Sequence, residues 1–241
     1  MKIVNVKNII TKYLTRVFGL RSSCTFQSSQ NKNSGISMAN ILEVIPRNPV
    51  ILEAGGHDGI NTIDLAKIPG AFVHTFEPVP NVYQRLTNRV KDLKNVSTYN
   101  LALGSRPSIQ NMYVSSGRND ASSSLSKPKD ISVFNPDVEF KETIEVRVET
   151  LDNWASNNSI AKLDFMWLDM QGHELEALKG GQSILNSVSA IYTEVNLLSV
   201  YEGIPLYHEV WEWIREFGFK INRIDFTWSD QGEVLFVREK S

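Results

Sequence analysis

Several features that would assign the chain to a particular protein class are missing from its sequence. Among 241 residues there is one cysteine, Cys24, so no disulfide can form within the chain, and we expect a reducing, cytoplasmic location. No apolar run approaches the roughly 20 residues that span a bilayer. After residue 42 acidic residues outnumber basic ones, which argues against a nucleic-acid partner, because phosphate binding requires a basic groove. The length and the hydrophobic share of 41% suit one globular α/β domain.

Acidic residues are also missing from the first 42 positions, which carry Lys and Arg instead. Ile3, Val6, Ile10 and Val17 recur there at helical spacing, so residues 1–20 are predicted to form a basic amphipathic helix. Such a helix can lie on an anionic membrane surface as a peripheral contact, pack against the main domain or a partner, or act as an organellar transit peptide. Residues 21–37, rich in Ser, Asn and Gln, are typical of a flexible linker, which leaves 38–241 as the globular domain.

The globular domain opens with a glycine-rich turn between two predicted strands. Apolar residues predict buried strands at 50–52 and 71–76, joined by a helix at 61–67. The turn contains Gly55, Gly56 and Gly59, whose backbone can approach a ligand closely. It differs from the dinucleotide fingerprint Gly-x-Gly-x-x-Gly, because His57 occupies the position of the middle glycine. A turn that merely joins a strand to a helix is the alternative.

Acidic side chains around this turn favour a positively charged adenosyl ligand. A carboxylate at Glu53, two residues before Gly55, would repel a pyrophosphate but would accept hydrogen bonds from an ammonium. S-Adenosylmethionine carries such a group. Glu77 ends the second strand, where it can hold a ribose, and Asp58 within the turn is a further candidate for cofactor binding.

Strands and helices alternate through the rest of the chain, which predicts a doubly wound α/β sheet. Further strands are expected at 96–103, 162–168 and 189–195, helices at 79–93, after 171 and at 204–217, and a closing hairpin at 219–226 and 234–237 around residues 230–232. Asn100 and Ala102 would meet an adenine edge at the end of the third strand, unless this segment is only an interior strand and turn. Edge or hairpin strands are predicted at 108–116 and 143–148, and the polar residues 115–140 between them form either a mobile cover over the site or a solvated loop.

Four acids fall at the carboxyl ends of predicted strands, the edge where open α/β sheets bind ligands: Glu53, Glu77, Asp169 and Glu194. For methyl transfer to a hydroxyl, Asp169 or His173 can take the proton or orient the group that does, and Glu194 can bind the substrate. Structural alternatives are a helix-start role for His173 and a cation partner for Glu194. The same three residues offer ligands for a divalent metal, but metal-free chemistry is favoured because no single motif holds a dense ligand cluster.

Taken together, these motifs resemble the FkbM-type methyltransferases over roughly residues 49–237. The block from Asp169 to Gly181 is the most specific part, because it resembles the family's Asp-x-Glu/Gln-Gly-x-Glu-x-x-x-Leu-x-Gly run in order and spacing. The other matching segments are Glu53-Ala-Gly-Gly-His-Asp-Gly59, Phe76-Glu-Pro78, Asn100-Leu-Ala-Leu-Gly104, Thr150-Leu-Asp152 and Glu194. The chain departs from the family at Ser105, where an acid is common, and in its basic start before residue 42.

The resemblance implies a class I, Rossmann-like methyltransferase fold with about seven strands and a C-terminal antiparallel hairpin. It implies S-adenosylmethionine-dependent O-methylation of a sugar, glycan, glycolipid or other hydroxylated small molecule. Glu53, Gly55 and Gly59 would then line the methionine end, Glu77 the ribose and Asp169 the neighbourhood of the methyl group. The alternatives are N-methylation, methylation of a non-sugar metabolite, and a partner module that binds the cofactor without catalysis.

Overall fold

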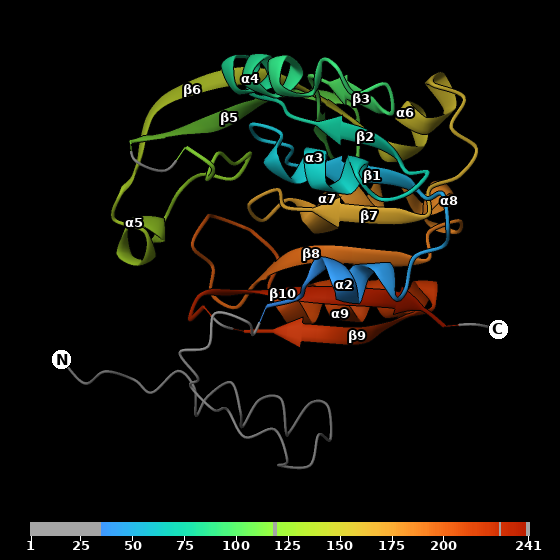
Figure 1. The fold of residues 1–241 in the computed structure, drawn as a ribbon. Helices are drawn as coiled ribbons and strands as arrows, with labels where there is room; N and C mark the ends of the chain where they lie inside the picture. Colours follow the sequence, from blue (N-terminus) through green and yellow to red (C-terminus); the bar gives the residue numbers. More distant parts are fainter. Residues whose placement is uncertain (1–34, 118–119, 227, 240–241) are drawn as a thin grey trace, which may run out of the picture. The chain divides into compact units, whose positions relative to one another are not determined.

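Seven strands form the central sheet in the order β3-β2-β1-β7-β8-β10-β9 (Figure 1). The computed structural model describes residues 35–117, 120–226 and 228–239, within a compact unit that spans Ile36–Ser241. The parallel strands are β1 (Val50–Ala54), β2 (Phe72–Phe76), β3 (Val96–Tyr99), β7 (Phe165–Leu168) and β8 (Ala190–Asn196). The last strand, β10 (Gln231–Arg238), runs antiparallel to both β8 and β9 (Phe219–Asp225). The predicted doubly wound sheet with an antiparallel C-terminal pair is therefore confirmed.

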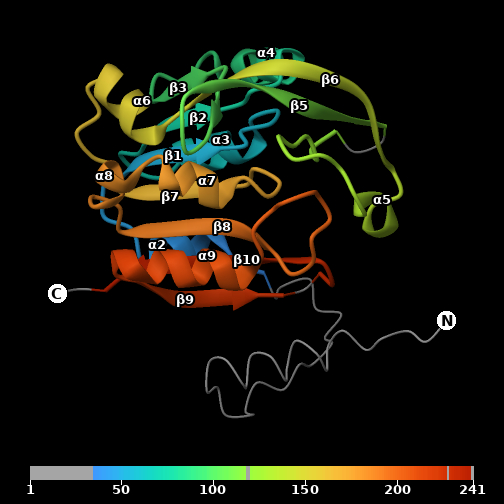
Figure 2. The same cartoon turned by 180° about the vertical axis from the view of Figure 1, so that it is seen from behind.

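Helices cover both faces of this sheet. Their bounds are α2 (Met38–Leu42), α3 (Ile60–Ala66), α4 (Pro80–Val90), α6 (Leu151–Asn157), α7 (Glu174–Lys179), α8 (Gln182–Leu185) and α9 (Tyr207–Ile214). Helices α2 and α3 lie over one face, and α7, α8 and α9 lie over the other (Figures 1 and 2). On the first face Ile41 and Leu65 pack with Ile51 and Val73 of the strands in one apolar cluster. This burial of strand residues from both sides fixes the sheet against its helices.

A second, three-stranded sheet is formed by β4 (Ala102–Leu103), β6 (Val138–Glu149) and β5 (Ser108–Gly117), in that order. The prediction of one strand over residues 96–103 is wrong, because the chain leaves the central sheet after Tyr99. The side chain of Asn100 donates hydrogen bonds to the carbonyls of Glu77 and Pro78, at 2.8 and 3.0 Å, and holds this change of direction. Ala102 then joins an apolar cluster with residues of α4, β5 and β6.

Other element boundaries also differ from the prediction. Strand β6 begins at Val138 instead of residue 143. The helix expected at 204–217 begins at Tyr207 and ends in the 3₁₀ helix η1 (Arg215–Phe217). Gln231 and Gly232 were expected in a turn, but they pair with Asn196 and Val195 as the first residues of β10. The helix expected after residue 171 is divided at Gly180 and Gly181, since α7 ends at Lys179 and α8 begins at Gln182.

The predicted basic helix at 1–20 and most of the linker at 21–37 lie outside the described residues. At the start of the described part, Ser37 caps α2, and its hydroxyl accepts a hydrogen bond from the backbone N–H of Asn40. Within the described residues no helix is long and apolar enough to cross a membrane.

Candidate active site

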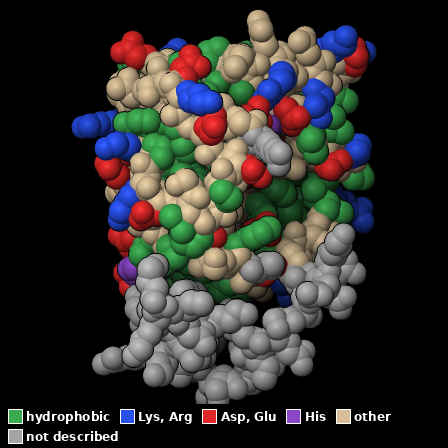
Figure 3. Space-filling view, turned by 90° about the vertical axis from the view of Figure 1, so that its left-hand side faces the viewer, with side chains coloured by type: hydrophobic (Ala, Val, Ile, Leu, Met, Phe, Trp, Pro, Cys, Tyr) green, Lys and Arg blue, Asp and Glu red, His purple; other side chains and the backbone are tan. Residues whose placement is uncertain are grey.

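A cavity of about 280 Å³ lies at the carboxyl edge of the parallel strands. Its walls come from the turn after β1, the end of β2, the turn after β7, the second sheet, and the segment 120–125 that follows β5. Figure 3 views the molecule from this side and shows acidic and basic side chains around a hollow with apolar walls. Seven of the residues predicted for the site line the cavity: Gly55, Gly56, Asp58, Glu77, Ala102, Asp169 and His173.

The glycine turn crosses tightly over the ends of β2 and β7. Gly55 has a φ of +91°, and a Cβ atom there would lie 1.8 Å from the carbonyl oxygen of Asp169. A Cβ atom at Gly56 would lie 2.2 Å from Oγ1 of Thr75. Both glycines donate their backbone N–H to the carbonyl of Phe76, at 3.1 and 2.9 Å. Only glycine therefore fits at these two positions, and the bare backbone forms part of the cavity wall.

Three residues predicted beside the cofactor, Glu53, Gly59 and Asn100, do not line the cavity. Gly59 has a φ of +87° and precedes α3, where a Cβ atom would meet Leu86 at 2.9 Å, so its requirement for glycine comes from backbone conformation and packing. Glu53 lies fully buried in β1, beneath the turn. Its Oε2 accepts a hydrogen bond from Thr62 at 2.5 Å, whereas Oε1 has no hydrogen-bond partner among the described residues. Burial raises the pKa of Glu53 to about 7, although the Thr62 hydrogen bond lowers it.

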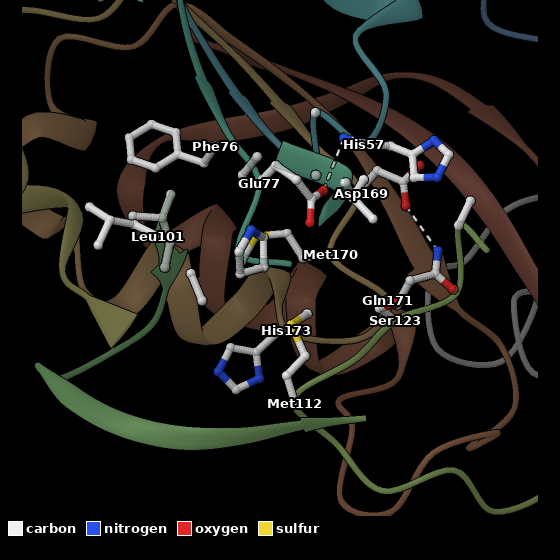
Figure 4. Close-up of a pocket in the computed structure, with 18 of the residues that line it drawn as sticks. His57, Phe76, Glu77, Leu101, Met112, Ser123, Asp169, Met170, Gln171 and His173 are labelled. Atoms are coloured by element: carbon white, nitrogen blue, oxygen red, sulfur yellow. Dashed lines mark hydrogen bonds between the residues drawn. The ribbon is translucent and has the colours of Figure 1, made fainter. Parts of the chain in front are cut away.

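Glu77 ends β2 and faces the cavity, as Figure 4 shows. Its Oε1 accepts a hydrogen bond from the N–H of Val79 at 2.8 Å, and its Oε2 accepts one from the N–H of His57 at 3.1 Å. Burial raises the pKa of Glu77 to about 7, against the effect of these two hydrogen bonds. Asn100 does not line the cavity, because its side chain is used to hold the backbone of Glu77 and Pro78. Leu101 and Ala102 line the cavity in its place.

Asp169 and Glu194 are joined by a residue that the sequence did not single out, Gln171. Nε2 of Gln171 lies 2.9 Å from Oδ1 of Asp169 and 3.3 Å from Oε1 of Glu194. Asp169 and Gln171 line the cavity, but Glu194 does not. Burial raises the pKa of Asp169, which the Gln171 hydrogen bond lowers. Burial and the neighbouring Asp169 raise the pKa of Glu194 well above its usual range.

The turn after β7 is shaped by Glu174, another residue that sequence reasoning did not place in the site. Its Oε1 accepts hydrogen bonds from the N–H groups of Met170 and Gly172, at 2.7 and 3.2 Å. This arrangement sets the path of the chain between Asp169 and His173. Burial lowers the pKa of His173, so its imidazole is neutral near pH 7. Within the described residues, no group of three or more His, Cys, Asp and Glu side chains is arranged to hold a metal ion.

The segment 120–125 contributes Asp120, Ala121, Ser123 and Leu125 to the cavity wall. Oδ1 of Asp120 lies 2.9 Å from Nε2 of His57, and Oδ2 accepts a hydrogen bond from Arg85 at 2.5 Å. Farther along, Ser122 accepts a hydrogen bond from the hydroxyl of Tyr201 at 2.8 Å, and Ser124 donates one to the carbonyl of Gln171 at 2.8 Å. This part of the polar residues 115–140 is therefore a wall of the site. Neither His57 nor Asp120 carries a sequence signal that would join them across 63 positions.

The cavity wall is acidic at one end and apolar at the other. Its carboxylates are Asp58, Glu77, Asp120 and Asp169, and among the described residues that line it there is no Lys or Arg. Arg85 and Arg89 approach from α4 and pair with Asp120 and Asp58 at 2.5 and 2.8 Å. Phe76 and Leu101 lie on the side of Glu77 away from Asp169 (Figure 4), where Leu101 offers apolar surface for a flat ring, whereas Phe76 is only 1% exposed. Carboxylates beside such a surface suit a cationic ligand with hydroxyl groups and an aromatic base.

Comparison with known proteins gives matches that cover most of the chain. The family model of the methyltransferase FkbM domain matches residues 53–221. The 2-O-methyltransferase NoeI of Sinorhizobium fredii (strain NBRC 101917 / NGR234) is 31% identical over 166 residues, which are 66% of this chain and 68% of that protein. Among solved structures, the N-terminal domain of EvdMO1 in the presence of SAH and D-fucose has a TM-score of 0.51 at 10% identity, with 97% of each chain covered. This last likeness concerns the fold.

Proposed function

Because the chain belongs to the FkbM methyltransferase family, whose members depend on S-adenosylmethionine, we propose that it methylates a hydroxyl group of a sugar or sugar-containing molecule. The observation that carries the proposal is the position of Asp169. Its carboxylate lies at the end of β7 and lines the cavity beside the glycine turn. The relative NoeI is a 2-O-methyltransferase, which supports an oxygen acceptor.

The residues of the cavity fit S-adenosylmethionine. Glu77, oriented by two backbone N–H groups, would accept hydrogen bonds from the ribose hydroxyls, and the apolar surface at Leu101 would hold the adenine. The backbone of Gly55 and Gly56 would lie along the methionine end. The unpartnered Oε1 of Glu53 beneath that turn is a buried acceptor that a bound ammonium, directly or through a water molecule, would satisfy. When bound, the cofactor supplies a methyl group on a positively charged sulfur.

Asp169 then accepts the proton of the acceptor hydroxyl. If the bound cofactor gave its methyl group to the acceptor oxygen, the O–H proton would pass to the Asp169 carboxylate and the electron pair of the broken C–S bond would stay with the cofactor. The raised pKa of Asp169 makes it a stronger base than an ordinary carboxylate, whereas the lowered pKa of His173 makes that imidazole a weaker one. His173 is accordingly assigned to orienting the acceptor by accepting a hydrogen bond. Positioning of the hydroxyl in line with the methyl group supplies much of the acceleration.

The charge of the cavity wall limits which sugars can serve as the methyl acceptor. Since none of the described lining residues is Lys or Arg, and Arg85 is already paired with Asp120, no described cation is free to neutralise a phosphate or a uronic acid near Asp169. The reacting sugar is therefore uncharged, with its hydroxyl groups free to donate to these carboxylates.

The test is a panel of acceptors incubated with the full-length protein and S-adenosylmethionine carrying a labelled methyl group. Neutral monosaccharides and glycosides, amino sugars, and uronic acids form the three arms, and the methylated atom is located by NMR. The expected result is an O-methyl product in the neutral arm and little in the uronic acid arm. An N-methyl product, or cofactor binding with no transfer to any sugar, would contradict the proposal and favour an N-methyltransferase or a non-catalytic binding module.

A further inference from the structure

Gln171 lies between two buried carboxylates, and its amide nitrogen donates hydrogen bonds to both. The amide nitrogen carries two hydrogens, and its distances of 2.9 Å to Asp169 Oδ1 and 3.3 Å to Glu194 Oε1 allow one hydrogen bond to each. The backbone of Gln171 has a φ of +52°, in the left-handed region that costs a residue with a side chain roughly 1 kcal/mol. The amide of Gln171 therefore lies between the two acids on a turn whose backbone is strained.

The rest of Gln171 is anchored as well. Its Oε1 accepts a hydrogen bond from the hydroxyl of Tyr201 at 3.3 Å, and its backbone carbonyl accepts one from Ser124 at 2.8 Å. At the far end of the pair, Oε2 of Glu194 accepts a hydrogen bond from Nε2 of Gln231 at 2.8 Å. The amides and the carboxylates thus form one continuous chain from the cavity wall to β10.

The two carboxylate oxygens of Asp169 differ in their hydrogen bonding. Oδ1 is taken by Gln171, while none of the described residues donates a hydrogen bond to Oδ2. Because Asp169 lines the cavity, Oδ2 is the oxygen left for a ligand.

We propose that Gln171 is a positioning residue for methyl transfer, whose amide holds Asp169 by Oδ1 so that Oδ2 meets the acceptor hydroxyl, and which joins Asp169 to Glu194 so that the two carboxylates titrate as one unit. The proposal rests on the proposed function in taking Asp169 as the group that accepts the proton.

The electrostatic setting of the pair makes the amide effective. The titratable groups that face it are His57 and Glu53 from β1 and its turn, Glu174 from α7, Tyr192 on β8, Tyr201, and Asp230 and Glu233 at β10. Most of these groups are acids, which do not stabilise the ionised form of Asp169. The Gln171 amide is therefore one of the few nearby groups that do. Removal of the Gln171 amide should therefore raise the pKa of Asp169 further.

A carboxyl NMR titration tests this directly. The full-length protein, labelled with ¹³C at the aspartate carboxyl groups and free of cofactor, is titrated as wild type and as Gln171→Met, with Asp169→Asn used to assign the resonance. Methionine keeps the length of the side chain and removes both donors. The Asp169 resonance of Gln171→Met should titrate about one pH unit or more above that of the wild type, and the acid limb of kcat/KM should move with it. An unmoved resonance would overturn the proposal.

Two further variants keep the test decisive. Gln110→Met removes an amide on β5 whose hydrogen-bond partner in the described part of the chain is Ser108, and it should leave the Asp169 resonance unchanged. Gln231→Met removes the donor to Glu194 without touching Gln171. Glu194 should then take up a proton more readily and repel Asp169 less, so the Asp169 resonance should titrate at lower pH, the opposite direction. An unchanged resonance in Gln231→Met would overturn the coupling even where Gln171→Met does not fold.

The titration uses no acceptor, so the two proposals can fail separately. A shifted Asp169 resonance in a protein that methylates no hydroxyl would reject the proposed function and leave the carboxylate pairing in place.

Discussion

His57 and Asp120 meet at the cavity wall, with Nε2 of the histidine 2.9 Å from Oδ1 of the aspartate, although 63 positions separate them in the chain. The backbone N–H of the same histidine donates to Glu77, so one residue contacts both the expected ribose carboxylate and the segment 120–125. Arg85 binds the second oxygen of Asp120. Closure of the wall and orientation of Glu77 therefore depend on a shared residue.

Replacement of Asp120 by alanine should weaken substrate binding more than it weakens the fold. The pairs that Asp120 makes are half exposed, and such pairs contribute at most about 1 kcal/mol to stability. We expect Asp120→Ala to raise the KM of the acceptor by about three- to tenfold, with kcat changed less than about twofold. Steady-state kinetics measure both. Asp130→Ala, which removes an exposed carboxylate beside Lys129, is the control, and equal KM values in the two variants would contradict a binding role.

Alanine at Gly55 should destabilise the protein far more than alanine at Gly203. Both glycines have a positive φ, +91° and +72°, so both substitutions incur backbone strain of about 1 kcal/mol. Only at Gly55 would the added Cβ atom also collide with backbone, 1.8 Å from the Asp169 carbonyl, whereas Gly203 has nothing within 4 Å. Chemical denaturation should show a loss of more than about 3 kcal/mol for Gly55→Ala. Similar losses for both variants would show that the turn has room to relax.

The affinity for S-adenosylmethionine should depend on the ionisation of Glu77. Burial raises the pKa of Glu77 to about 7, and an ionised carboxylate accepts hydrogen bonds from ribose hydroxyls better than a protonated one. Calorimetry should therefore show tighter binding as the pH rises from about 6 to about 8. Glu77→Gln should bind roughly tenfold more weakly at the upper end and lose much of this pH dependence. Asp64→Asn, which removes an exposed carboxylate paired with Lys67, should behave like the wild type.

The cofactor-free protein should lose stability as the pH rises. Glu53, Glu77 and Glu174 each have a pKa raised from 4.5 to about 7 by burial. Between these values the folded protein holds protons that the unfolded chain releases, so the free energy of unfolding falls through this window and levels off above it. Glu53→Gln removes one of the three groups and should make the fall shallower. Denaturation at several pH values from about 5 to about 8 measures the free energy of unfolding of both proteins. An equal fall with pH in the wild type and in Glu53→Gln would count against the raised pKa of Glu53.

The central sheet was predictable because its strands are apolar runs bounded by glycine, proline and acids, and this pattern is local. The acids at the strand ends followed from the same pattern, and Glu77 and Asp169 line the cavity as expected. The break after Tyr99 could not be seen, because it depends on hydrogen bonds from Asn100 to backbone more than 20 positions earlier.

Within the site, the differences between the predicted and observed positions of side chains have a common physical origin. A residue's position at a strand end does not say whether its side chain turns into the cavity or away from it. Glu53 points beneath the glycine turn, and Glu194 is separated from the cavity by Gln171. His57, Asp120 and Gln171 became visible only through contacts between segments that are distant in the sequence or turned by a strained backbone.

In the proposed reaction, Asp169 takes the proton of a sugar hydroxyl as the methyl group is transferred. The most direct measurement is the single-turnover rate of Asp169→Asn with S-adenosylmethionine and a neutral sugar acceptor, together with the calorimetric affinity for the cofactor. Asparagine keeps the shape and the acceptor for Gln171 but cannot take the proton. The rate of Asp169→Asn should be lower by about 10²- to 10⁴-fold, with cofactor affinity within about fivefold of the wild type. A rate near that of the wild type would contradict this role of Asp169.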